Sequence, residues 1–139
     1  MTVTVNGKAA VERVVITGMG WVTPLGDDIE NVWQALLDGK SGAGPITRFD
    51  VSDYPTRIGA EIKDFAPEDF IEKKSLRRMD PSEQYAVVAA QKAYDHAGLG
   101  SADIDLERAG VIIGSGIGGI TTFEAQHQKL LDGGPGKVS

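Results

Sequence analysis

Apolar residues along the chain follow two patterns, short β-branched runs and longer stretches with helical spacing. The runs at residues 13–17 and 111–113 are rich in Val and Ile and end at glycines, as in strands buried on both faces of a sheet. Spacings of three and four between apolar residues predict helices over residues 29–37, 81–97 and 120–131. Strands that lead into helices in this way indicate an α/β fold.

The first two thirds of the chain also contain weaker signals. Asp27 or Asp28 is expected to cap the helix over residues 29–37. Gly and Pro interrupt the stretch that follows, which predicts loops with a short strand at residues 58–62. A short helix is expected at residues 67–71.

The long helix has a strong start signal. Asp80 is expected to cap it, with Pro81 in its first position and Glu83 in its third, and Gly98 is expected to end it. Most of its apolar residues are small, so the helix can approach a neighbour closely and be buried on more than one side.

Four glycines lie within residues 114–119, between the second predicted strand and the last helix. Their spacing matches a dinucleotide-binding fingerprint, although the nearest suitable acidic residue, Asp132, is predicted in a loop. Glycines that let a helix pack hard on a sheet explain the same spacing, and so does the wall of an apolar pocket carrying Ile117. In each case Gly116 is expected to need a backbone with positive φ.

Composition narrows the classes of function. The 139 residues are 41% hydrophobic and 24% charged, enough for one modest core in one domain or part of one. A net charge of -6 argues against a nucleic-acid binder. Residues 1–12 look like a flexible leader and are neither a signal peptide nor a membrane span, so the expected location is the cytoplasm.

The sequence offers few groups for catalysis or metal binding. It contains no Cys, which excludes disulfides, thiolate zinc sites and a Cys nucleophile within these residues. His96 and His127 are interpreted as packing or helix-dipole residues, and we expect no metal and no cofactor. Neither Ser115 nor Thr121 has a base that the sequence places beside it, so no catalytic residue is assigned.

Residues 72–78 form a basic cluster in an acidic protein. Such a run is commonly a solvated surface, and it is also the kind of patch that an acidic partner recognises. Residues alone leave both interpretations open.

Several motifs in order resemble the N-terminal part of a β-ketoacyl-acyl-carrier-protein synthase, and within that family the type II elongating enzymes of the thiolase superfamily. The motifs are Arg13-Val14-Val15-Ile16-Thr17-Gly18-Met19-Gly20, Pro24-Leu25-Gly26, Leu36-Leu37-x-Gly39-x-Ser41-Gly42, Phe49-Asp50, Arg77-Arg78-Met79-Asp80 and Gly114-Ser115-Gly116-Ile117-Gly118-Gly119. The match begins at about Val11, so the leader over residues 1–12 lies almost entirely before it. Residues 13–139 would then be an incomplete N-terminal half of a thiolase-like fold, a mixed sheet packed by helices and truncated before the catalytic cysteine region.

The resemblance also implies an activity, the decarboxylative Claisen condensation of an acyl thioester with malonyl carrier protein in fatty-acid biosynthesis. In the family pattern the nucleophilic Cys and two catalytic His residues lie beyond Ser139, so the chain alone is expected to be inactive. The alternatives are a non-catalytic partner subunit that controls chain length and a nucleotide-binding domain. Full-length members are cytoplasmic homodimers, with no nucleic-acid or membrane partner.

Binding residues are carried over by the same resemblance. Ile117, with Gly116 beside it, matches the isoleucine that gates the apolar acyl tunnel. Lys74, Arg77 and Arg78 match a basic patch that receives the acyl carrier protein. Lys137 is expected on the same surface, although a second basic residue that family members often have beside it is replaced here by Gly136.

Overall fold

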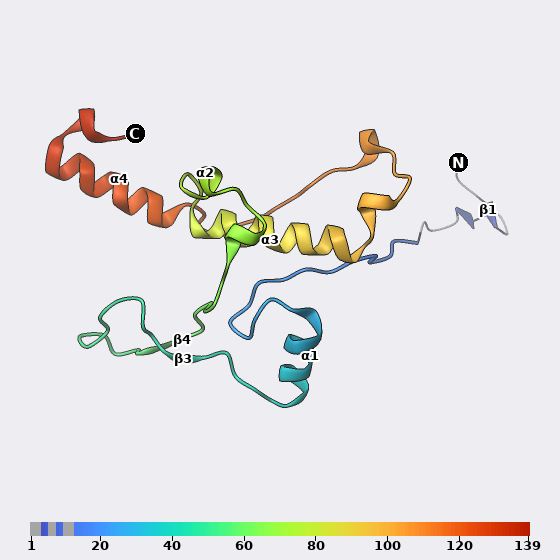
Figure 1. Cartoon of the computed structure of the whole chain (residues 1–139), viewed down its shortest axis with the longest axis horizontal. Helices are drawn as coiled ribbons and strands as arrows, with labels where there is room; N and C mark the ends of the chain where they lie inside the picture. Colours follow the sequence, from blue (N-terminus) through green and yellow to red (C-terminus); the bar gives the residue numbers. More distant parts are fainter. Residues whose placement is uncertain (1–3, 6–7, 10–12) are drawn as a thin grey trace.

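A computed structural model describes residues 4–5, 8–9 and 13–139, and it is built mainly of helices (Figure 1). The α-helices are α1 (Ile29–Leu37), α2 (Lys73–Leu76), α3 (Pro81–His96) and α4 (Ile120–Gly133). The 3₁₀ helices are η1 (Pro67–Asp69), η2 (Leu99–Ser101), η3 (Leu106–Arg108) and η4 (Pro135–Lys137). The strands are β1 (Thr4–Val5), β2 (Lys8–Ala9), β3 (Gly44–Pro45) and β4 (Ile58–Gly59). Most of the predicted flexible leader lies outside the described residues and stays a prediction.

Helix α1 has the ends that its sequence predicts. Asp28 caps it, because one carboxylate oxygen accepts a hydrogen bond from the amide of Asn31 at 2.9 Å. Gly39 follows it at φ 68°, and the amides of Gly39 and Lys40 donate to carbonyls of the last turn. Val32 and Ala35 are buried, whereas Trp33, Leu36 and Leu37 are more than half exposed.

Helix α3 confirms the start signal read from the sequence. The Asp80 side chain accepts a hydrogen bond from the amide of Ser82, and the Glu83 side chain accepts one from the amide of Asp80 at 3.2 Å. This reciprocal capping box satisfies amides that have no partner inside the helix. At the other end Gly98 takes φ 65°, as its place after the last turn requires.

The two β-branched runs are extended but are not paired in a sheet, so the predicted strands at residues 13–17 and 111–113 are wrong for this structure. Val14 is 95% exposed and Ile112 fully exposed. β-branched residues favour an extended backbone, but a strand also needs a neighbouring strand to which its backbone can hydrogen-bond. The described residues supply none for these two runs.

The sheets that do form are small. β1 pairs with β2, and β3 pairs with β4, each antiparallel and two residues long. The strand expected over residues 58–62 is therefore confirmed only at its start. The described residues do not form the expected mixed sheet packed by helices, and their regular secondary structure is mostly helical.

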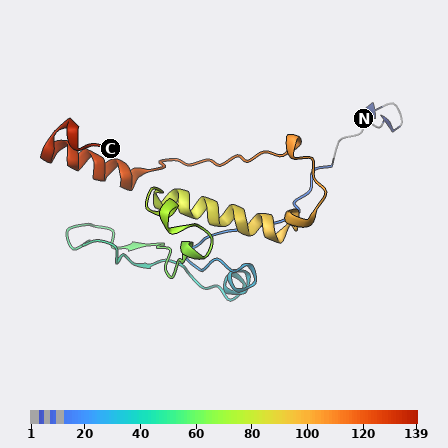
Figure 2. The same ribbon diagram turned by 45° about the horizontal axis from the view of Figure 1, so that its top comes forward.

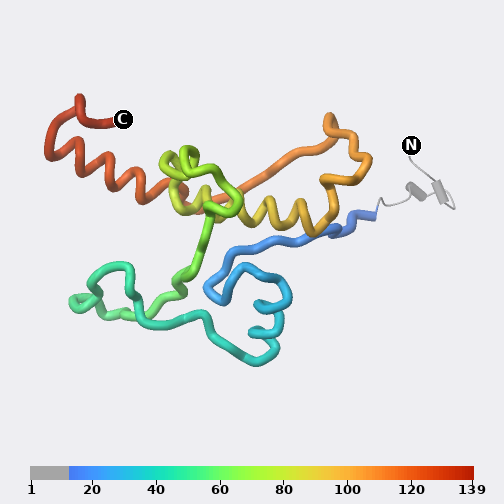
Figure 3. The backbone as a smooth tube through the Cα atoms, in the orientation of Figure 1, coloured from blue at the N-terminus to red at the C-terminus, as the bar shows by residue number. Residues whose placement is uncertain are grey.

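Two glycines allow the first extended run to lie directly against the backbone of α3. A Cβ added to Gly18 would lie 2.5 Å from the carbonyl oxygen of Ala93, and one added to Gly20 would lie 2.2 Å from that of Ala89. Residues 13–20, in blue, follow the second half of α3 in the tube view (Figure 3). The small residues of α3 permit the close approach that the sequence predicts, and their partners are these glycines.

Lys92 joins α3 to two neighbouring segments. Its ammonium group lies 3.0 Å from a carboxylate oxygen of Asp27 and donates to the Asp27 carbonyl at 3.2 Å. The same group lies 5.2 Å from the centre of the Phe70 ring, within the range of a cation–π interaction. Lys92 therefore connects α3 to the start of α1 and to the segment after η1.

Gly20→Ala should destabilise the protein, because the new methyl group would overlap the main chain of α3. Overpacking of this kind costs about 1 to 3 kcal/mol. The matched control is Gly110→Ala, since a Cβ at Gly110 meets no atom within 4 Å. Thermal unfolding followed by circular dichroism at 222 nm should show a lower Tm for Gly20→Ala alone. Equal Tm values for the two variants would contradict the close contact.

Candidate functional site

The glycine-rich turn at residues 114–119 lies over the first half of α3. Figure 2 shows the extended segment before the turn running along α3, in orange, and continuing into α4. A hollow of about 440 Å³ separates the turn from the helix, and its walls are mostly small or apolar. It is lined by Ser82, Glu83, Ala86, Val87, Ile113, Gly114, Ser115, Gly118 and Gly119.

The turn itself differs from the expectation in one respect. Gly119, rather than Gly116, has the left-handed backbone, with φ 71°. Gly116 does not have a positive φ, so that expectation is wrong, and a Cβ added there would meet no atom within 4 Å. Ile117 lies between them with 74% of its surface exposed. The turn therefore presents an exposed apolar side chain, although Ile117 itself does not line the hollow.

Asp80 holds the end of this turn against α3. One carboxylate oxygen accepts hydrogen bonds from the amide and hydroxyl of Ser82, both at 3.3 Å. The other accepts a hydrogen bond from the amide of Thr122, in the first turn of α4, at 3.0 Å. The Ser82 hydroxyl in turn accepts a longer hydrogen bond from the Gly119 amide at 3.4 Å. One buried carboxylate thus serves the N-termini of two helices.

These contacts favour the ionised form of Asp80. The hydrogen bond from the Thr122 amide is the largest cause that holds the pKa of the Asp80 carboxyl below its ordinary value. Hydrogen bonds from Ser82 act in the same direction, and burial opposes them. The net direction agrees with the geometry, since both helix N-termini present donors and positive partial charge to this side chain.

The same arrangement argues against a nucleotide site at the glycine-rich turn. A pyrophosphate would have to bind the amides at the start of α4. There the Asp80 carboxylate already accepts a hydrogen bond from the Thr122 amide. The segment before the turn is not a paired strand. Asp132, expected in a loop, lies instead within α4. The three parts of the dinucleotide fingerprint are therefore not assembled here.

The basic cluster is exposed, as a binding patch requires. Lys74, Arg77 and Arg78 lie in and just after α2, immediately before the cap of α3. The two ion pairs within the described residues, Lys40–Asp38 and Lys92–Asp27, do not involve this cluster. Lys137 is exposed at the end of η4, and its place on the same surface stays a prediction.

The histidines and hydroxyls are not assembled into a catalytic group. The His96 ring accepts a hydrogen bond from the Met19 amide at 3.0 Å, so it fastens the first extended run to the end of α3. The His127 ring stacks on Phe123 with centroids 6.1 Å apart. Among the described residues, no hydrogen bond joins Ser115 or Thr121 to a His. The same residues contain no group of three or more His, Cys, Asp or Glu that could hold a metal ion.

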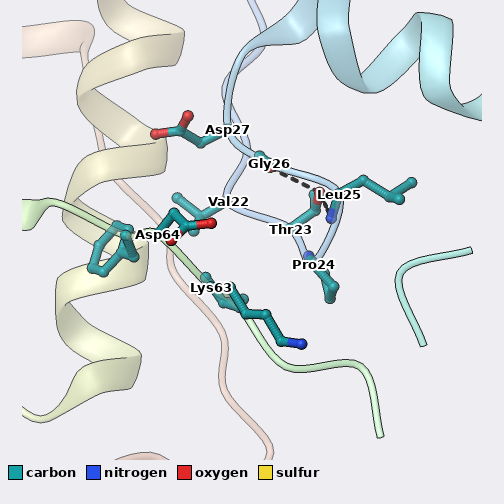
Figure 4. Close-up of a pocket in the computed structure, with 10 residues that line it drawn as sticks. Val22, Thr23, Pro24, Leu25, Gly26, Asp27, Lys63 and Asp64 are labelled. Carbon is teal, nitrogen blue, oxygen red and sulfur yellow. Dashed lines mark hydrogen bonds between the residues drawn. The ribbon is translucent and has the colours of Figure 1, made fainter. Parts of the chain in front are cut away.

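A second hollow, of about 310 Å³, lies beside the tight turn at residues 23–26 (Figure 4). The turn closes through the amide of Thr23, which donates to the Gly26 carbonyl at 2.9 Å. Asp27 points away from this turn toward α3, where Lys92 binds it. Lys63 and Asp64 form the facing wall, and Asp64 has the left-handed φ of 53°. No catalytic role follows from the geometry of this turn.

Sequence reasoning missed two positioning contacts. Asp80 was expected only as a helix cap, but its second oxygen binds α4 across 42 positions of sequence. Gly18 and Gly20 were expected only to end a strand, but they make close contact with α3. A signal for the second contact does exist, because glycines two apart can face alanines spaced by four on a helix. No comparable signal identifies the partner of Asp80.

Comparison with known families gives a match over nearly the whole chain. The model of the family described as Beta-ketoacyl synthase, N-terminal domain, matches residues 11–138. Among curated relatives, 3-oxoacyl-[acyl-carrier-protein] synthase 2 of Coxiella burnetii is 49% identical over 127 residues. The protein of the same name from Synechocystis is 44% identical over 128 residues, and that from Staphylococcus aureus 48%.

Solved structures give the same family. The ishigamide ketosynthase/chain length factor superposes with a TM-score of 0.71 at 30% identity, covering 90% of this chain. A beta-ketoacyl synthase from Burkholderia phymatum superposes with a TM-score of 0.66 at 31% identity, covering 89%. This similarity supports the expectation that the chain has the fold of the N-terminal part of a ketosynthase.

The chain spans about a third of the length of the relatives that it matches. It covers 91 to 92% of its own length in the three curated alignments but 31% of each relative. It likewise covers 31% of both solved chains. In the part of the chain that the structure describes, no helix combines the length and apolar character needed to cross a membrane.

Asp80→Asn should destabilise the protein at neutral pH, and the difference from wild type should narrow in acid. The native state lowers the Asp80 pKa, so ionised Asp80 contributes its full stability above the ordinary value of about 3.9. That contribution is lost as pH falls through the lower native value. Denaturant unfolding measured from pH 7 down to pH 2.5 checks this. A difference that stays constant over the whole range would contradict the role of the charge.

Proposed function

The chain belongs to the β-ketoacyl synthase family, and we propose that it forms part of a 3-oxoacyl-[acyl-carrier-protein] synthase of fatty-acid biosynthesis. The observation that carries this proposal is the 44 to 49% identity to 3-oxoacyl-[acyl-carrier-protein] synthase 2 proteins over more than nine tenths of the chain. The family match over residues 11–138 includes both the glycine-rich turn and the basic cluster.

The proposed reaction is an acyl transfer followed by carbon–carbon bond formation. A thiol first takes the acyl group from a carrier-bound thioester, and the carrier thiol leaves. Loss of CO₂ from malonyl carrier protein then gives an enolate, whose carbon attacks the acyl carbonyl and releases the enzyme thiol. The first step requires a thiolate nucleophile. These 139 residues contain no Cys, so in this proposal the chain alone is inactive.

Ile117 and Gly116 are proposed to contact the acyl chain. The support is the exposure of the Ile117 side chain, in a turn whose other residues line a hollow with mostly small or apolar walls. The hydrocarbon of an acyl group gains about 0.8 kcal/mol for each methylene buried in such surroundings. A hydrocarbon chain forms no hydrogen bonds, so the turn would recognise the length and shape of the acyl group.

Lys74, Arg77, Arg78 and Lys137 are proposed to bind the acyl carrier protein. The proposal is supported by the exposure of all four side chains. The first three also lie close together in sequence, in α2 or just after it. A cationic patch on a protein with net charge -6 would orient an acidic partner, because the partner is repelled elsewhere. In the same proposal the complete enzyme is a cytoplasmic homodimer that uses no cofactor.

A second candidate function is a non-catalytic partner that controls chain length. The observation that favours this candidate is the solved ishigamide ketosynthase/chain length factor, on which this chain superposes over 90% of its length. The two candidates differ in chemistry. Only a condensing subunit forms a covalent acyl-enzyme, which mass spectrometry detects in any longer polypeptide that contains this chain.

The isolated 139-residue chain should not condense acyl and malonyl carrier proteins. Without a thiol it cannot form the acyl-enzyme, however well it binds its partners. Product analysis by mass spectrometry of the carrier-bound thioesters checks this. Turnover by the purified chain, above that of a heat-treated sample, would contradict the proposal that the nucleophile lies outside these 139 residues.

Reversing two charges of the basic cluster, Arg77→Glu with Arg78→Glu, should weaken binding of acyl carrier protein by about tenfold. Exposed ion pairs contribute about 0.2 to 1 kcal/mol each, and reversal replaces attraction with repulsion of similar size. Since such interactions are screened over about 8 to 10 Å in physiological salt, wild-type binding should also weaken as salt rises. Isothermal titration calorimetry at several salt concentrations measures both effects.

The matched control is Arg108→Glu with Lys129→Glu, which changes the net charge equally at exposed sites in η3 and α4. It should weaken binding less than the variant in the basic cluster. Equal losses in both variants would show that the carrier responds to net charge and not to this patch.

A further inference from the structure

Asp80 lies where three features of the chain meet. It follows Arg77 and Arg78 of the basic cluster almost directly in sequence, and it caps α3. Its second carboxylate oxygen binds Thr122 in the first turn of α4, three residues after the glycine-rich turn ends. At 5% exposure it is the one charged side chain among the described residues that is buried. A buried carboxylate is retained at such a point only when its hydrogen bonds compensate for lost hydration.

The glycine-rich turn has little else to hold it. Among the described residues, no hydrogen bond reaches residues 114–118 from another part of the chain. The first anchored group is the Gly119 amide, which donates to Ser82, and the next is the Thr122 amide, which donates to Asp80. Both anchors belong to the first turn of α3. The position of Ile117 therefore depends on that turn.

Helix α4 adds no competing support. None of its residues is buried, and both Figure 1 and Figure 2 show it projecting away from the other helices. Its contact with the start of α3 consequently determines where α4 and the turn before it lie. A shift at the start of α3 would be passed to them through the Asp80 carboxylate.

We propose that Asp80 is a positioning residue that couples the basic cluster to the glycine-rich turn, so that an acidic carrier protein bound at Arg77 and Arg78 changes the surroundings of Ile117. This coupling rests on the proposed function for its ligand. Its structural part, the attachment of the turn to α3 by Asp80, does not depend on any ligand. The coupling would link arrival of the carrier to the state of the acyl-binding turn.

Asp80→Asn separates the two roles of this side chain. Asparagine keeps one oxygen acceptor and can still cap α3, since Asn is among the best N-cap residues. It has no second acceptor for the Thr122 amide, because the other oxygen becomes an amide nitrogen, which is a donor. The matched control is Asp28→Asn, which alters the cap of α1 in the same way and contacts neither α4 nor the turn.

The first measurement is amide hydrogen exchange in the 139-residue chain without any partner. In Asp80→Asn the Thr122 amide should exchange about tenfold faster than in wild type, the size expected for one net hydrogen bond. In Asp28→Asn exchange at Thr122 should be unchanged. Equal exchange at Thr122 in wild type and Asp80→Asn would overturn the attachment.

The second measurement adds apo acyl carrier protein and follows chemical shifts of the backbone amides and of the Ile117 methyl groups. In wild type and Asp28→Asn, signals from both the basic cluster and residues 114–119 should move. In Asp80→Asn the basic cluster should still respond while the turn does not. A turn that responds equally in Asp80→Asn would overturn the coupling.

The two measurements also separate this inference from the proposed function. If wild type shows no response anywhere to the carrier protein, carrier binding and the coupling both fail, whereas faster exchange at Thr122 still establishes the attachment. If the carrier binds and the turn never moves, the proposed function stands and the coupling is wrong.

Discussion

The close contact between the main chain at Gly18 and Gly20 and the backbone of α3 is the constraint on which the described structure depends. No side chain fits between the two, since even a Cβ would come within 2.2 to 2.5 Å of helix carbonyl oxygens. The contact fixes where the chain leaves for α1, and Lys92 secures that exit by binding Asp27. The second extended run lies along the same helix. A groove of about 490 Å³ along α3 is lined by residues of both runs, including Gly20 and Ile113.

Helix α3 therefore acts as the scaffold for the proposed site, and its N-terminus is where the functional features gather. The basic cluster precedes it, and Asp80 holds the glycine-rich turn against it. The dipoles at the N-termini of α3 and α4 and a buried carboxylate together replace the support that a completed sheet would give to the turn. Among the described residues the buried apolar core is small, consisting of Val32, Ala35, Ile71 and Val88. Polar contacts at the start of α3 therefore matter for the position of the turn.

Local signals predicted local structure well. The caps at Asp28 and Asp80 and the glycines at positions 39 and 98 each satisfy groups within one turn of a helix, so sequence alone determines them. Pairing of the run at residues 111–113 depends on distant partners, and its exposure shows that β-branched composition cannot supply them. The site follows the same division. Motifs suggest Ile117 and the basic cluster as site residues, which stay predictions. The contact between Asp80 and Thr122 could not be predicted, because no local signal near either residue identifies the other.

Membership of the β-ketoacyl synthase family and the arrangement around α3 lead to one central claim, that this chain supplies the acyl-binding turn and the carrier-binding patch of a condensing enzyme. The most direct measurement replaces the matched third of the Coxiella burnetii 3-oxoacyl-[acyl-carrier-protein] synthase 2 with residues 11–138 and assays the hybrid. The account predicts condensation of acyl and malonyl carrier proteins at a rate within about tenfold of the parent, the equivalent of about 1.4 kcal/mol in the barrier. A hybrid that folds with the parent's Tm and forms no condensation product would contradict it.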